Sequence, residues 1–228
     1  GLIIAGSLCG IAFGRFMKEN LKQTLMVVSG IIVLLLGMSG AMQYMLVIVN
    51  GSLQTTGPLL MIISMVVGAI IGEIIDLNRW ITVFGDWVKA KTGNTGDPQF
   101  THAFITASLT FTVGAMGVLG SIQDGLTGNY QTLLLKGILD GIIVMVMTSS
   151  MGKGALFSFI PVGITQWIIT AMAHIAAPLM TPSAIDNLSY VGSILIFCVG
   201  IDLIWPGKVR IANLLPAIFV AMGLTFLL

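Results

Sequence analysis

Two side chains of opposite charge interrupt a long apolar segment in the middle of the sequence. The segment Thr132–Ser150 is apolar enough to cross a bilayer, and it contains Lys136 and Asp140. Because they are four residues apart, a helix places both on one face. Charges inside a bilayer are costly and mark pathways of ions, protons and polar solutes. Two interpretations follow. The pair is either a structural ion pair that lowers the cost of insertion, or a binding site where Asp140 holds an ion or proton and Lys136 is its partner in the empty state.

A second group of residues that could bind an ion surrounds the end of the preceding apolar segment, Thr101–Ser121. Glycines recur there at every third position, among hydroxyl, amide and carboxyl side chains. The group comprises Thr112, Gly114, Gly117, Gly120, Ser121, Gln123 and Asp124. A glycine-rich break in a membrane helix leaves backbone groups unpaired unless protein or water covers them. Its carbonyl oxygens and the hydroxyls would suit a hard cation, whereas freed N–H groups would suit an anion.

The same glycines allow a different interpretation. They let two helices cross closely, and residues 123–128 then form an ordinary external turn. If the break is correct, Gln123 and Asp124 lie near the outer end of Thr132–Ser150 and are expected to complete a site with Asp140.

Four other polar residues are weaker candidates: Glu73, Asp76, Asp202 and Asn213. Glu73 and Asp76 are three residues apart, which favours a structural ion pair with Arg79 near a shared helix face. Asp202 and Asn213 flank a loop that carries two basic residues, and we interpret them as a surface ion-pair cluster.

Motifs of known catalytic chemistry are absent from the sequence, including HExxH, GxSxG and a Cys–His arrangement. His102 and His174 are far apart in sequence and lack a third ligand, while Cys9 and Cys198 lie in apolar runs. We therefore expect no enzymatic activity, no metal and no cofactor.

The composition indicates a membrane protein. Hydrophobic residues make up 56% of the 228 residues and charged residues only 8%, against about 25% charged in soluble domains. The net charge of +1 argues against a nucleic-acid partner. The chain begins with glycine, so we expect residues to precede it, and apolar segments that continue to the last residue argue against a cleaved signal peptide.

The hydropathy pattern predicts an all-α, polytopic bundle of about eight spans in one transmembrane domain over residues 1–228. A span needs about 20 residues. The expected spans are Leu2–Phe16, Leu25–Ile48, Pro58–Leu77, Thr101–Ser121, Thr132–Ser150, Ala155–Ala176, Ala184–Ile204 and Ile211–Leu228. Residues 78–91 instead show apolar residues at helical spacing with Trp80 and Trp87, which is typical of an amphipathic helix in the membrane interface.

Basic residues test this count independently. Nine of the ten lysines and arginines fall in alternate connections of the eight-span arrangement, which assigns that side to the cytoplasm and both termini to the outside. The nine are Arg15, Lys18, Lys22, Arg79, Lys89, Lys91, Lys153, Lys208 and Arg210.

Two of the expected spans are alike in sequence. Leu25–Gly37 aligns without a gap with Leu188–Gly200, and small residues coincide at three positions. This match predicts repeat units over residues 1–77 and 155–228. A shift of five spans is odd, so the units would have opposite orientations, as in the inverted repeats of many secondary transporters.

Several motifs resemble one family across nearly the whole chain. They are Gly72–Asp76, Gly85–Trp87, Phe104–Leu109, Val113–Met116, Gly120–Leu126, Lys136–Gly141 and Ala212–Ala217. With these the chain resembles the bacterial membrane proteins of the domain-of-unknown-function family 554. The resemblance implies a place in the bacterial inner membrane and a role in transport, and it names no substrate.

A secondary transporter for an ion or small polar solute is therefore the leading functional hypothesis, with the site formed by the fifth span and the glycine-rich part of the fourth. A channel or uncoupled pore shares all these features. An intramembrane enzyme and a non-catalytic membrane subunit are weaker alternatives. The expected partners are the lipid bilayer, the solute and a second copy of the chain in a homodimer.

Overall fold

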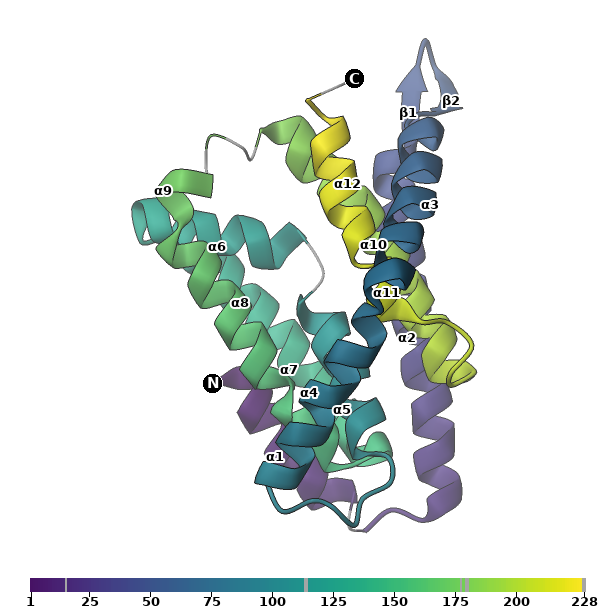
Figure 1. The fold of residues 1–228 in the computed structure, drawn as a ribbon, viewed down its shortest axis with the longest axis vertical. Coiled ribbons are helices and arrows are strands. Elements are labelled where there is room, and N and C mark those ends of the chain that lie inside the picture. Colours follow the sequence, from purple (N-terminus) through teal and green to yellow (C-terminus); the bar gives the residue numbers. More distant parts are fainter. Residues whose placement is uncertain (15, 113–114, 177, 179–180, 227–228) are drawn as a thin grey trace.

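The fold is a bundle of helices of unequal length that carries one β-hairpin (Figure 1). The computed structural model describes the chain except for residues 15, 113–114, 177, 179–180 and 227–228. Among the described residues the elements are α1 (Leu2–Gly14), α2 (Glu19–Met45), β1 (Leu46–Val49), β2 (Ser52–Thr55), α3 (Pro58–Ile75), α4 (Leu77–Lys91), α5 (Phe100–Thr112), α6 (Ala115–Thr127), α7 (Gln131–Met151), the 3-10 helix η1 (Lys153–Ser158), α8 (Phe159–Ala171), α9 (Ala173–Ala176), α10 (Pro182–Ile204), α11 (Ile211–Leu214) and α12 (Pro216–Leu224).

Five helical segments of the described chain are long and apolar enough to cross a membrane: Asn20–Met45, Pro58–Ile75, Gln131–Met151, Lys153–Ala171 and Pro182–Ile204. The pair α5 and α6 adds a sixth if it is one bent span. Leu2–Gly14 and Ile211–Leu224 are apolar but shorter than the roughly 20 residues that a span needs. The chain is thus a multi-pass helical membrane protein with five to six candidate spans.

Apolar side chains cover the outside of the long helices. Ile31 and Leu35 of α2, Ile70 of α3 and Ile142 of α7 are among the many exposed ones. Such a surface is unfavourable in water and matches the hydrocarbon of a bilayer. Residence in the lipid bilayer follows from it.

The expectation of an all-α chain is wrong at one place. The second span was expected to reach Ile48, but α2 ends at Met45 and Leu46–Val49 pairs in antiparallel register with Ser52–Thr55. Asn50 and Gly51 join the strands, both with positive φ (51° and 77°). Asn-Gly is the preferred pair for such a tight turn, and the β-branched residues before it favour a strand.

Glycines set how the helices pack in pairs. Gly6, Gly10 and Gly14 of α1 lie against Gly141, Met145 and Ser149 of α7, so these two helices run parallel. On α3, Gly68 and Gly72 lie against Ala217 and Asn213 of the last helices, so that pair is antiparallel. A side chain at any of these glycines would meet backbone atoms of the partner, which explains why the small residues occur at intervals of four.

α2 and α10 form the longest antiparallel pair and lie side by side in Figure 1. Gly37 of α2 lies against Phe197 of α10, and Gly200 of α10 lies against Leu34 of α2. Val33, Val199 and other buried residues around this crossing form the main apolar core, to which α5 and α7 also contribute.

The segment expected to lie in the membrane interface is a helix, α4, that follows α3 after a sharp change of direction at Asp76. Asp76 has φ 52° and ends one helix and begins the next. Val88 is buried on the bundle side, while Trp80 and Trp87 are exposed. α4 is therefore amphipathic in the way the sequence predicts.

The expected fourth span, Thr101–Ser121, is divided into α5 and α6, whose axes differ by 70°. Gly114 of the predicted site lies between the two helices in sequence and outside the described residues. The expectation of a helix end near Ser121 with an external turn at 123–128 is wrong, because α6 stays helical to Thr127. Gly120 and Gly125 pack closely against Leu133 and Thr170 of neighbouring helices. These contacts agree with the interpretation in which glycines in this segment let two helices cross closely.

Candidate functional site

Lys136 and Asp140 meet inside the bundle as the sequence predicts. The Lys136 Nζ group donates a hydrogen bond to the Asp140 carboxylate one turn along α7 and a second, at 2.8 Å, to the carbonyl oxygen of Phe111 on α5. Both residues are buried, with 7% and 8% of their surface exposed. The second bond ties α7 to the end of α5, because that carbonyl is among the last of α5 and has no partner within its own helix.

Gly117 makes room for the Lys136 side chain. A Cβ atom at position 117 would lie 3.2 Å from the Lys136 Cε atom, which is tighter than ordinary van der Waals contact. A larger residue would therefore press on the lysine and disturb its bonds. Of the glycines in the predicted site, this one acts directly on the ion pair.

The ion pair lines a cavity of about 400 Å³ between α2, α5, α7 and α10. Its polar lining includes residues that the sequence analysis did not single out, because they belong to helices far apart in the chain. They are Ser39, Gln43, Tyr44, Thr110, Ser189 and Ser193. A volume of this size is in the range of small-molecule sites.

The hydroxyls of this cavity are oriented as acceptors. Thr110, Ser189 and Ser193 each donate their hydroxyl hydrogen to the carbonyl four residues earlier in their own helix. A hydroxyl that already donates keeps its oxygen lone pairs for another partner. Together with the Asp140 carboxylate, the cavity thus offers oxygen acceptors, which suit a cation or a solute rich in N–H or O–H donors.

Asp140 also lines a second cavity, of about 310 Å³, on another side of α7. Leu2 and Ile3 of α1 and Val162 and Gln166 of α8 contribute to its wall. Asp140 therefore contributes to the walls of two cavities.

Most of the other predicted residues from α6 lie away from this cavity. Gln123 accepts a hydrogen bond from Thr132 Oγ1 at 2.7 Å, at the start of α7. Asp124 is half-buried near the end of α6. Ser121 is buried, and its hydroxyl has no hydrogen-bond partner among the described residues. The structure places none of these three, nor Gly120, in the lining of the cavity that holds Lys136 and Asp140.

Thr112 faces a different space. It lines a small apolar cavity of about 160 Å³ together with Phe84 of α4 and Phe104 of α5. Its hydroxyl is buried without a partner within the described part of the chain. The structure thus separates Thr112 from the ion pair, although Phe111, its neighbour in sequence, accepts the bond from Lys136.

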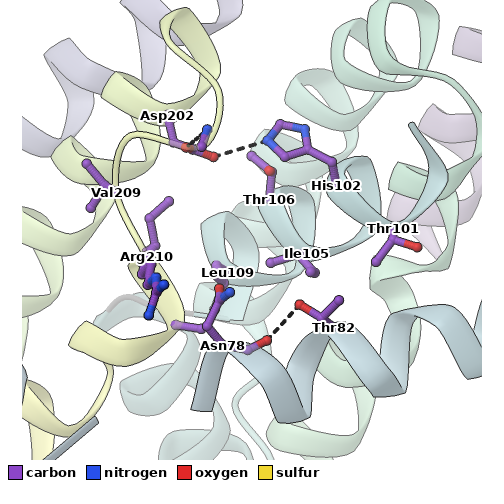
Figure 2. Close-up of a pocket in the computed structure, with 13 residues that line it drawn as sticks. Asn78, Thr82, Thr101, His102, Ile105, Thr106, Leu109, Asp202, Val209 and Arg210 are labelled. Atoms are coloured by element: carbon purple, nitrogen blue, oxygen red, sulfur yellow. Dashed lines mark hydrogen bonds and ion pairs between the residues drawn. The ribbon is translucent and has the colours of Figure 1, made fainter. Parts of the chain in front are cut away.

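Asp202 lies in a further cavity, of about 370 Å³, between α4, α5 and the end of α10 (Figure 2). Its interpretation as part of a surface ion-pair cluster is wrong. Asp202 is only 6% exposed. Its carboxylate accepts a hydrogen bond from the backbone N–H of Gly207 at 2.8 Å and meets His102 Nε2 at 3.1 Å. The sequence analysis missed His102, since its partner is 100 residues away along the chain.

The three remaining candidates join helix ends. Glu73 pairs with Arg210 at 3.1 Å across an exposed contact, where the sequence favoured Arg79. Asn213 is 1% exposed, and its Oδ1 atom accepts a hydrogen bond from the backbone N–H of Asn78 at 2.6 Å. With Asp76 at the junction of α3 and α4, these residues connect the end of α3 to α11 and have a structural role.

Comparison with known proteins agrees with this architecture. The model of the family described as "Protein of unknown function (DUF554)" matches residues 1–226. The chain belongs to this family. It is similar to the "Uncharacterized membrane protein YdfK" of Bacillus subtilis (strain 168), with 27% identity over all of this chain and 93% of that protein. It is also similar to the "Uncharacterized protein YqgA" of Escherichia coli (strain K12), with 24% identity over 98% of this chain and 92% of that protein. No solved structure matches.

The resemblance noted in the sequence is thus confirmed at the level of the family. Lys136 and Asp140, as well as His102 and Asp202, lie within the part of this DUF554 chain that the family model matches.

Proposed function

We propose that this DUF554 protein is a secondary transporter that moves a cation or a small polar solute across the bacterial inner membrane, and that it catalyses no reaction. The observation that carries the proposal is the buried Lys136–Asp140 pair in the wall of a cavity that hydroxyl side chains also line. In the empty state Lys136 neutralises Asp140. An incoming cation or donor group takes over the carboxylate, and Lys136 keeps the Phe111 carbonyl as a partner.

The position of Asp140 between two cavities supports movement of the solute past it. Secondary transporters expose one site alternately to the two sides of the membrane. A residue in the wall of two cavities, with its carboxylate paired to Lys136, fits this requirement.

An inverted repeat belongs to the same proposal. In the alignment of Leu25–Gly37 with Leu188–Gly200, Leu34 is equivalent to Phe197 and Gly37 to Gly200. The contact of Gly37 with Phe197 is matched by that of Gly200 with Leu34. Such an exchange of equivalent contacts is what a two-fold axis between α2 and α10 would produce, and inverted repeats related by such an axis are common in secondary transporters.

The eight-span arrangement, with both termini outside and basic loops in the cytoplasm, completes the proposal. It requires the first and fifth spans to be parallel, and the second and seventh to be antiparallel. The packing of α1 on α7 and of α2 on α10 has these directions. A homodimer in the membrane is part of the proposal on general grounds, since closed symmetric dimers are the commonest oligomers.

The test is flux in proteoliposomes across a panel of Na⁺, K⁺, H⁺ and small organic anions. The native protein is compared with Asp140→Asn, Lys136→Met and the control Lys91→Met, which removes an exposed lysine at the end of α4. Saturable flux that both site variants lose while they remain folded, and that the control keeps, would support the proposal. Flux that the site variants retain, or no flux of any solute, counts against it. Flux that does not saturate would make the protein a pore.

A further inference from the structure

The cavity around Asp202 has the properties of a binding site of its own. It has about 370 Å³ of space and is lined from α4, α5, α10 and the connection 205–210. Its lining residue on α10, Asp202, comes later in the helix than those that line the Lys136–Asp140 cavity. It lies toward the end of α10 that leads to the basic residues of the connection 205–210. The two cavities share no lining residue: Leu109 of the apolar core lines this one and Phe111 lines the other. It is therefore a second site and not an extension of the first.

The lining combines one buried carboxylate with neutral polar groups and an apolar wall. Asp202 uses its two oxygens for Gly207 and His102, but each carboxylate oxygen has a further lone pair. Figure 2 shows Thr106 beside this carboxylate, with Asn78 and Thr82 on α4 at the opposite side of the cavity. Ile105 and Leu109 add an apolar surface. This combination fits a small molecule with one positive group and a short hydrocarbon part.

The charges around the cavity decide the sign of the ligand. Arg210 lies at its exposed rim, where it pairs with Glu73 of α3 and where solvent screens its charge. Asp202 is the buried charge, and a buried anion gains most from a cationic partner that also donates hydrogen bonds. An ammonium group meets this need, and the hydroxyls of the lining can accept its remaining N–H bonds.

We propose that this cavity binds a small primary amine in its ammonium form, with the Asp202 carboxylate as the main partner and His102 as a competitor for it. His102 already contacts one oxygen of that carboxylate, so an ammonium group must share this oxygen with the imidazole or displace it.

The proposal is tested by saturation-transfer NMR on the purified protein in detergent micelles, with n-butylammonium as the probe. Pentanoate and 1-pentanol have a similar size but opposite or no charge, and micelles without protein give the background. We expect saturation transfer to n-butylammonium alone. Asp202→Asn should weaken binding about tenfold or more, because a hydrogen bond to a charged group contributes at least about one factor of ten.

Two further variants separate this site from its surroundings. His102→Gln retains a hydrogen-bond donor for Asp202, so it should keep amine binding. Asp140→Asn should bind the probe as the native protein does, which keeps the result independent of the transport proposal. Equal transfer to all three probes, binding that survives in a folded Asp202→Asn, or a preference for pentanoate would each overturn the amine site. Elution as a single monodisperse peak establishes that each variant is folded.

Discussion

The Lys136 ammonium group holds two parts of the molecule together through one side chain. It bonds to Asp140 on its own helix and to the Phe111 carbonyl on α5. Removal of the lysine leaves a buried carboxylate without its cation, and loss of one member of a buried ion pair is strongly destabilising, whereas loss of both costs much less. The Lys136–Asp140 contact thus contributes to stability, and it is the same contact that a solute would have to replace.

From this we expect Lys136→Met to lower the free energy of unfolding by about 3–5 kcal/mol. The double variant Lys136→Met/Asp140→Asn should recover most of that loss, because no charge then remains buried. Unfolding by a denaturing detergent, followed by tryptophan fluorescence, measures both. A double variant as unstable as the single one would mean that the lysine acts through the Phe111 contact and not through Asp140.

At this scale the sequence predicts contacts within a helix and misses those between helices. The Lys136–Asp140 pair follows from a spacing of four residues in an apolar segment. The His102–Asp202 pair joins residues 100 positions apart, and nothing in the local pattern of either residue points to the other. The same holds for Ser189 and Ser193, which line the cavity only because α10 packs beside α2.

Among the elements, α1 depends most directly on its glycines. A Cβ atom at Gly10 would meet the backbone carbonyl of Met145 on α7, and that carbonyl cannot move without a shift of the helix. Gly163 of α8 is a matched control, since it also lies inside an apolar helix, but a Cβ atom there would have no neighbouring atom within 4 Å.

We expect Gly10→Ala to lower the free energy of unfolding by about 1–3 kcal/mol, as overpacking usually does. Gly163→Ala should be neutral or stabilise by up to about 1 kcal/mol, because alanine favours the helix over glycine. Thermal unfolding of the two variants in one detergent gives the comparison. Equal effects of the two substitutions would show that the glycines matter for helix propensity and not for the contact of α1 with α7.

Several elements could be predicted from hydropathy alone, while their ends could not. The apolar segments correspond to helices, and the amphipathic segment 78–91 corresponds to α4. The hairpin was not predicted because residues 46–48 are as apolar as the helix before them and were assigned to the same span. Asn50-Gly51 is nevertheless a strong turn signal. The division of α5 from α6 depends on tertiary packing of α6 on α7, α8 and α9, which hydropathy does not report.

The whole molecule has two ends that the sequence distinguishes by charge. In Figure 1 the β-hairpin lies at one end, and the connections from α1 to α2 and from α4 to α5 lie at the other. The start of α2 and the α7–η1 connection also lie at this second end, because Lys22, Asp97 and Lys153 line one cavity. Because basic loops stay in the cytoplasm, this end should face inward and the hairpin outward.

This orientation can be measured by cysteine labelling in a background in which Cys9 and Cys198 are replaced by alanine. Ser52 in the hairpin and Thr95 between α4 and α5 are both exposed and equivalent in chemistry. We expect a membrane-impermeant maleimide to label Ser52→Cys in intact spheroplasts, and to label Thr95→Cys only after the membrane is permeabilised. The reverse pattern would invert the topology and place the Asp202 cavity at the outer face. Labelling of both sites in intact cells would place the hairpin and the α4–α5 connection on the same side and exclude the eight-span arrangement.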